Sequence, residues 1–299
     1  MDMDNLLKIL KNYDLIGIGE QAHGELISWK IRYKIIKYLT KYYDKVYIFC
    51  EQLDYFVNGL NNKNVKFIFN EDGFYPHIMA RSNLTNEHLY YTKKINKLLP
   101  KIKFYGIDIQ VVKYNDLYNK KDMSSELYNI IEKYKDEYLK KNLGSGIIRN
   151  KCNAFIINDL IQFLNKKNVN STSNNKFIYL GHNEHIAFNC FGTNKDKKYL
   201  TDGYYLKNIC NIKYLSIATY SNELYNVWHC IEINKCKIKL LKGKNKKIWN
   251  DLFNKNKNYK IISNSDSSEL KMDDYSITDF DYVICVKKNH KITLLKNYI

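Results

Sequence analysis

Runs of apolar residues bounded by polar turn residues recur through most of the chain. They lie at 15–19, 46–50, 65–69, 104–109, 177–180 and 214–219. Longer stretches with helical spacing of apolar positions fill most of the gaps between them. This alternation predicts an α/β fold in which a central, mainly parallel sheet carries helices on both faces.

The later part of the chain predicts a small antiparallel portion. Residues 227–233 and 236–241 flank Asn234 and Lys235, which is typical of a hairpin, and 282–286 with 292–295 predict another. There is no internal repeat, and the clusters of Lys and Asn indicate loops rather than linkers. We therefore expect a single domain over residues 1–299.

The helix that follows the first strand contains an arginine at an unusual position. With about 100° per residue from Leu26, the apolar side chains form one arc and the lysines form the other. Arg32 falls in the middle of the apolar arc. Because a guanidinium does not lose its proton on burial, Arg32 must face a carboxylate, a ligand or a water-filled crevice.

The chain is strongly basic, with 48 Lys and Arg against 31 Asp and Glu, a formal net charge of +17. Such an excess can indicate a nucleic-acid binder. However, arginine occurs only at Arg32, Arg81 and Arg149, and phosphate and guanine contacts favour arginine over lysine. We therefore expect no specific nucleic-acid partner.

Cysteine usage and the amino terminus bear on the compartment. The seven cysteines show no CxxC spacing, and Cys50 and Cys285 lie inside apolar runs, which predicts buried thiols in a reducing compartment. The acidic first residues are not followed by a long apolar run, so the sequence predicts neither a signal peptide nor a membrane span. The expected location is the cytoplasm.

Polar residues follow four of the predicted strands directly. The carboxyl ends of parallel strands are where open α/β sheets build their sites. The candidate residues at these ends are Glu20, His23, Glu51, Gln52, Asp108, Gln110, His182 and His185. Taken singly, each is more simply a helix cap, a turn residue or a packed side chain, and the combination makes a site the better interpretation.

The order and spacing of these residues resemble the erythromycin esterase family. The similarity consists of Gly-Glu-x-x-His-Gly at residues 19–24, an apolar strand ending in Glu51, Tyr-Gly-Ile-Asp-Ile-Gln at 105–110 and Gly-His-Asn-Glu-His-Ile at 181–186. It continues through Thr-Asp-Gly-Tyr-Tyr-Leu at 201–206 and Phe-Asp-Tyr-Val-Ile at 280–284, so it covers nearly the whole chain. The stretch between Gln110 and Arg149 is shorter than in members that cleave macrolides, so macrolides are not the expected substrate.

The resemblance implies hydrolysis of an ester or lactone without a metal or other cofactor. It makes His23 the general base that activates water, with Glu20 and Glu51 as the acidic residues that orient it. His182 and His185 match the second histidine pair of the family, which would donate to the oxyanion or to the leaving alkoxide. Arg32 matches an arginine on the same helix and, with Asp108 and Gln110, is expected to bind substrate.

The residues themselves leave the mechanism open. A histidine, with a reference pKa of about 6.5, suits a base near neutral pH. The sequence contains no Gly-x-Ser-x-Gly motif, which favours activated water over a covalent intermediate. One alternative is a metal-dependent hydrolase in which Glu20, His23, His182 and His185 hold a divalent ion. Another is a non-catalytic protein that binds a small molecule on the same scaffold.

Overall fold

The computed structural model describes most of the sheet and the helices that pack on it. The described residues are 1–21, 26–51, 54, 90, 93–95, 97–113, 123–140, 146–167, 174–188, 200–221, 223–228, 237–242, 259–266, 271–272, 275–276 and 279–286. The expected strand at 65–69 and the candidates His23 and Gln52 lie outside them.

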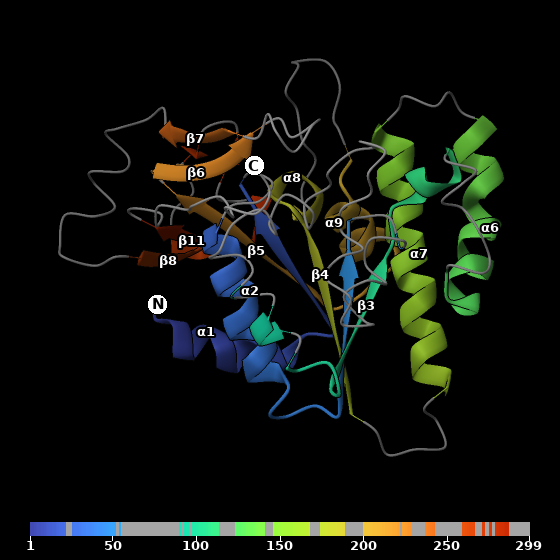
Figure 1. Cartoon of the computed structure of the whole chain (residues 1–299), viewed down its shortest axis with the longest axis horizontal. Coiled ribbons are helices and arrows are strands. Elements are labelled where there is room, and N and C mark those ends of the chain that lie inside the picture. Colours follow the sequence, from blue (N-terminus) through green and yellow to red (C-terminus); the bar gives the residue numbers. More distant parts are fainter. Residues whose placement is uncertain are drawn as a thin grey trace.

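A seven-stranded sheet forms the centre of the molecule, in the order β3-β2-β4-β1-β5-β11-β8 (Figure 1). All neighbours are parallel except β11 and β8, which are antiparallel. Its strands are β1 (Leu15–Glu20), β2 (Lys45–Cys50), β3 (Ile102–Gly106), β4 (Asn175–His182), β5 (Tyr214–Ser221), β8 (Tyr259–Ser263) and β11 (Tyr282–Val286). The predicted α/β class with a mainly parallel sheet is confirmed.

Helices cover both faces of this sheet, and Figure 1 shows α1 and α2 on one side and α6 and α7 on the other. The helical segments are α1 (Met3–Ile9), η1 (Leu10–Asn12), α2 (Leu26–Leu39), η3 (Ile109–Lys113), α6 (Ser125–Lys140), α7 (Gly146–Lys167), α8 (Asn183–Ile186), α9 (Asp202–Tyr204), the π-helix η4 (Tyr205–Ile209) and η6 (Asn264–Asp266). No helix among the described residues has the length and hydropathy of a membrane span.

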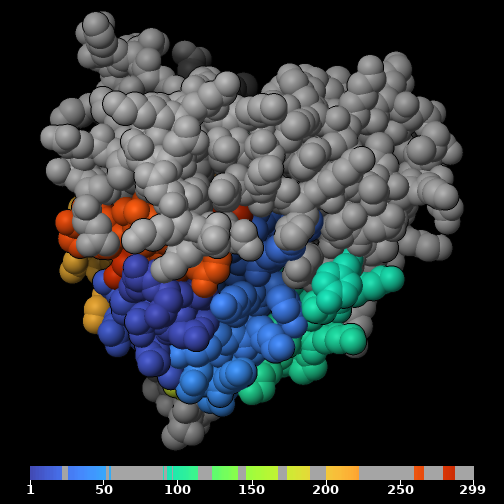
Figure 2. Space-filling view, turned by 90° about the vertical axis from the view of Figure 1, so that its left-hand side faces the viewer, coloured from blue at the N-terminus to red at the C-terminus, as the bar shows by residue number. Residues whose placement is uncertain are grey.

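Side chains that alternate along the strands divide the core into two layers. Ile16 and Ile18 of β1 pack with α1 and α2, whereas Leu15 belongs to the cluster that includes α6 and α7. Figure 2 shows α1 and α2, in blue, covering the first of these faces. Both faces are buried, as the near-continuous apolar runs of the strands predict for a parallel sheet.

The antiparallel portion differs from the prediction in its pairing. A separate hairpin pairs β6 (Glu223–Trp228) with β7 (Lys237–Lys242), close to the expected place, but β6 begins at Glu223 rather than Val227. Of the second expected hairpin, residues 292–295 lie outside the described residues, and its other strand, β11, pairs with β5 and β8 on its two edges. A further two-stranded sheet joins β9 (Lys271–Met272) and β10 (Tyr275–Ser276).

The cysteines that the structure describes are free thiols. Cys50, Cys152 and Cys285 are buried and Cys210 is half-buried. Burial raises the pKa of Cys50 and of Cys285 to about 12, so both thiols stay protonated. These cysteines act as small apolar core residues.

Candidate functional site

The register of the sheet brings the predicted strand ends to one edge. Glu20 at the end of β1 pairs in register with His182 at the end of β4. Cys50 at the end of β2 lies between Leu180 of β4 and Gly106 of β3. Glu51 directly follows β2 and Asp108 lies two residues after β3, so side chains from four strand ends meet at the carboxyl edge.

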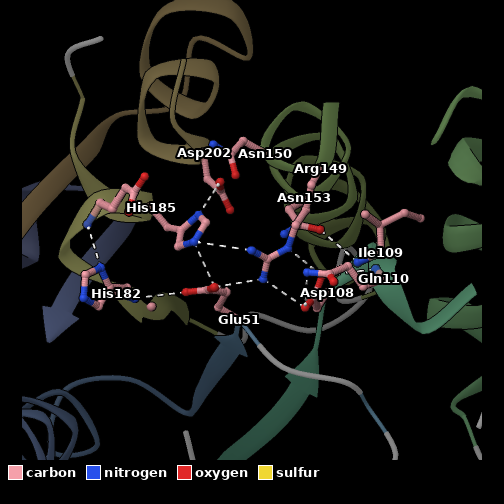
Figure 3. A network of polar contacts seen from close by, with 12 residues as sticks. Glu51, Asp108, Ile109, Gln110, Arg149, Asn150, Asn153, His182, His185 and Asp202 are labelled. Carbon is pink, nitrogen blue, oxygen red and sulfur yellow. Dashed lines mark hydrogen bonds and ion pairs between the residues drawn. The ribbon is translucent and has the colours of Figure 1, made fainter. Parts of the chain in front are cut away.

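The Glu51 carboxylate is the centre of the polar network at this edge (Figure 3). Its Oε1 accepts from Arg149 Nη2 at 2.9 Å and lies 2.9 Å from His185 Nε2. Its Oε2 accepts from the backbone N–H of His182 at 3.0 Å. One buried carboxylate thus joins strand β2 to helices α7 and α8.

Arg149 enters the site from the first turn of α7. Its Nε and Nη2 each lie 3.0 Å from one oxygen of Asp108, a two-pronged ion pair. Burial alone would lower the pKa of Arg149, but Asp108 and Glu51 raise it. Asp108 also accepts from the backbone N–H of Gln110 at 3.1 Å, so it is a turn residue and an ion-pair partner at once.

His185 lies between two carboxylates. Its Nε2 is 2.9 Å from Glu51, and its Nδ1 is 3.2 Å from Oδ1 of Asp202. A carboxylate only accepts hydrogen bonds, so these two contacts favour a proton on each ring nitrogen, the imidazolium form. Burial opposes this charge, but Glu51 and Asp202 raise the pKa of His185 to about 10.

The raised pKa has a consequence for stability. A group whose pKa is higher in the folded state stabilises the fold fully below its unfolded pKa of about 6.5. For His185 this stabilisation is lost as the pH rises from there through about 10.

His182 occupies the turn from β4 into α8. Its Nε2 lies 2.8 Å from the carbonyl oxygen of Gln21, and its Nδ1 accepts from the N–H of Glu184 at 3.4 Å. This pattern fits the tautomer that carries its proton on Nε2, with the ring acting as the N-cap of α8. The two histidines therefore face different partners and share Glu51, one through its ring and the other through its backbone.

Asn183 fixes α8 against the sheet. Its side-chain amide donates to the carbonyl of Thr219 at 2.9 Å and accepts from the Thr219 N–H at 3.3 Å. The approach is so close that a Cβ at Gly19 would lie 2.2 Å from the Asn183 oxygen. Glycine is required at position 19 by this contact.

Glu20 and Arg32 form a second buried pair beneath the edge. Arg32 Nη1 lies 3.3 Å from Glu20 Oε2, and the two side chains are 2% and 0% exposed. Arg32 Nη2 also donates to the carbonyls of Ile18 and Gly181, at 3.4 and 3.1 Å. Of the three surroundings that the sequence allows for Arg32, the structure shows a carboxylate.

The chain that leads to His23 is anchored at the same edge. Gln21 accepts from the ring of His182 through its carbonyl and from the N–H of Ser221 through its side chain, at 2.8 Å in each case. His23 follows Gln21 by two residues.

The roles of Arg149, Asp202 and Tyr179 in this network were not predicted from the sequence. Arg149 is one of three arginines in a lysine-rich chain, and this rarity is a usable signal. Asp202 lies within the Thr-Asp-Gly segment of the family resemblance. Tyr179 reads as an apolar strand residue, so nothing local predicts that its hydroxyl donates to Asp202 Oδ2 at 2.6 Å.

The described residues do not assemble a metal site. Among them, no group of three His, Cys, Asp or Glu side chains is placed to hold an ion. Both ring nitrogens of His185 face carboxylates, and those of His182 contact the backbone of Gln21 and Glu184. His23, the remaining histidine of the metal hypothesis, lies outside the described residues.

Comparison with known proteins identifies the fold. No family model and no curated protein sequence matches the chain. An erythromycin esterase, a point mutant of EreC in its open conformation, matches with a TM-score of 0.66 at 12% identity over 97% of this chain and 94% of that one. The chain therefore shares its fold, at a distance, with an erythromycin esterase.

Two further solved structures share the fold. A succinoglycan biosynthesis protein matches with a TM-score of 0.56 at 16% identity, over 98% of this chain and 92% of that one. A Bacillus cereus protein matches with a TM-score of 0.55 at 17% identity, over 99% and 94%. At these identities the likeness concerns architecture.

Replacing Arg32 with Met tests the buried pair. Arg32→Met leaves Glu20 buried without its cation, so we expect the free energy of unfolding to fall by about 3–5 kcal/mol. Adding Glu20→Gln should restore part of this loss, because the uncompensated charge disappears. Denaturant unfolding of the single and double variants measures both, and a single variant within about 1 kcal/mol of wild type would show that the pair is not structurally coupled.

Proposed function

We propose that this protein is a hydrolase of the erythromycin esterase type, which cleaves an ester or lactone by direct attack of water activated by His23. The observation that carries the proposal is the buried His185 ring between the Glu51 and Asp202 carboxylates, at the carboxyl edge of the sheet. The motifs of the sequence and the fold shared with an erythromycin esterase support it.

His23 supplies the base in this mechanism. Its ring accepts a proton from water as the water oxygen bonds to the ester carbonyl carbon, and the carbonyl oxygen becomes an oxyanion. The intermediate then collapses, the bond from carbon to the leaving oxygen breaks, and that oxygen takes a proton from His185. Solvent then takes the proton that His23 holds and reprotonates His185. The products are a carboxylic acid and an alcohol, without a covalent enzyme intermediate.

His185 and Arg149 provide the positive charge that this chemistry needs. Fixed cations at the site stabilise a developing oxyanion, because they need no reorientation as the charge forms. Glu51 contributes through them, since its oxygens already contact Arg149, His185 and the backbone of His182. Glu20 also forms an ion pair with Arg32 beneath this edge.

Replacing the proposed base tests the assignment directly. Purified protein should hydrolyse at least one member of a panel of small esters and lactones, and His23→Ala should lower that rate by about two to four orders of magnitude. The α6 variant Lys140→Ala, at a side chain that is 77% exposed, is the control and should keep the wild-type rate. A folded His23→Ala variant with more than a tenth of the wild-type activity would show that the water is activated elsewhere.

Chelation separates the free-base mechanism from the metal-dependent alternative. If His23 acts as a free base, exhaustive chelation followed by gel filtration should leave kcat/KM unchanged, and metal analysis should find no stoichiometric zinc or manganese. Near-stoichiometric metal whose removal abolishes activity and whose return restores it would establish the metal-dependent hydrolase instead.

A further inference from the structure

We propose that Asp202, held by the Tyr179 hydroxyl, is a positioning residue that keeps the His185 ring doubly protonated, so that His185 acts as a fixed cation and proton donor and not as a base. This inference deepens the proposed function and rests on it for its catalytic meaning. The part that concerns protonation stands on geometry alone.

Each oxygen of the Asp202 carboxylate has its own partner. Asp202 Oδ1 lies 3.2 Å from His185 Nδ1, and its other oxygen accepts from Tyr179 at 2.6 Å. The carboxylate is fully buried. It is therefore held from both sides and cannot turn toward water.

The backbone around Asp202 fixes it against the helix that carries His185. Thr201 caps α9 and donates through its hydroxyl to the carbonyl of Ala187, at the end of α8. A Cβ at Gly203 would lie 2.3 Å from the Ala187 carbonyl oxygen, so α9 approaches that backbone more closely than any larger residue allows. A π-helix, a feature frequent at functional sites, follows directly.

The contacts of the second ring nitrogen favour the doubly protonated ring. A neutral ring with its proton on Nδ1 would place the bare Nε2 lone pair 2.9 Å from Glu51 Oε1, an unfavourable contact between two acceptors. The donor that could serve a bare Nε2, Arg149 Nη1, lies 3.5 Å away, at the limit of a hydrogen bond. Glu51 Oε1 holds the two cations together.

The charged and titratable groups around His185 agree with a positive charge on its ring. The groups that face His185, directly or through one partner, are Glu51 after β2, Asp108 after β3, Arg149 on α7, Tyr179 on β4 and Asp202 on α9. The three carboxylates carry three negative charges against the single charge of Arg149, so a second cation on His185 brings the cluster close to balance. Burial alone lowers the pKa of His185, and the Glu51 and Asp202 carboxylates raise it to about 10.

The imidazolium has a defined use in the proposed reaction. It can stabilise the oxyanion and then give a proton to the leaving alkoxide as the bond to carbon breaks, and solvent afterwards takes the proton from His23 and returns one to His185. Activity then needs the protonated form of His185. It is lost as the pH rises through the pKa of that ring.

Nitrogen NMR of the histidine rings tests the proposal without any substrate. In the wild-type protein, both ring nitrogens of His185 should carry protons from pH 5 to pH 9. Asp202→Asn keeps the shape but removes the charge, and should lower the titration midpoint of His185 by about one to three pH units. Tyr179→Phe is the matched control, since it removes the hydroxyl but leaves the carboxylate charged, and should not lower the midpoint.

Three results would overturn the proposal. They are a wild-type His185 that is neutral at pH 7, an Asp202→Asn variant that titrates as the wild type does, and a Tyr179→Phe variant shifted as far as Asp202→Asn. If Asp202→Asn does not fold, the wild-type spectrum still decides, because protons on both ring nitrogens that persist at pH 9 are required.

The pH dependence of hydrolysis tests the catalytic meaning separately. Where the wild type hydrolyses an ester, Asp202→Asn should move the alkaline decline of kcat/KM to lower pH by the same shift that NMR measures. A decline that stays in place while the ring titration moves would show that the proton of His185 is not used. Absence of any hydrolysis would contradict the proposed function and leave the NMR result standing.

Discussion

The Glu51 carboxylate is the constraint on which the rest of the site depends. It is 5% exposed, and its two oxygens lie against three nitrogen atoms. These are Arg149 Nη2 of α7, His185 Nε2 of α8 and the backbone nitrogen of His182, which caps α8. A buried carboxylate is costly unless it is fully paired, so its environment must supply these donors. The positions of Arg149 and His185 follow from this requirement.

The sheet makes this arrangement possible because its parallel register ends neighbouring strands at one edge. Residues 51, 108, 149, 185 and 202 are far apart in the sequence, yet one ion-pair network joins them. Fixed charges of this kind are already oriented before any substrate binds, which is the property that stabilises a developing oxyanion. A rigid scaffold and a polar edge are thus two results of the same topology.

Much of the fold could be predicted because buried parallel strands are continuous apolar runs. The runs at 15–19, 46–50, 177–180 and 214–219 all lie within strands. The strand expected at 104–109 ends at Gly106, and Ile109 begins a 3₁₀-helix. Strand β8 was not predicted, because this edge strand buries few apolar positions and its first two residues are exposed.

The part of the site that lies at strand ends or on a helix face could be predicted from the sequence. Arg32 was identified because its place on an apolar arc requires a partner, and Glu51, Asp108 and the two histidines because they follow strands. Arg149 and Asp202 begin helices that follow no strand directly, so only tertiary packing brings them to the edge. The sequence likewise gives no sign that a carboxylate flanks each nitrogen of His185.

Unfolding of Glu51→Gln in denaturant tests the central claim most directly. Glutamine offers one acceptor and one donor where the structure requires acceptors at both oxygens, and it leaves two cations facing each other without their carboxylate. We expect a fall of about 3–5 kcal/mol in the free energy of unfolding, with a loss of about 1 kcal/mol or less for Asp136→Asn, a carboxylate that is 79% exposed and pairs with Lys140 at the surface. A Glu51→Gln variant as stable as Asp136→Asn would contradict the central position of Glu51.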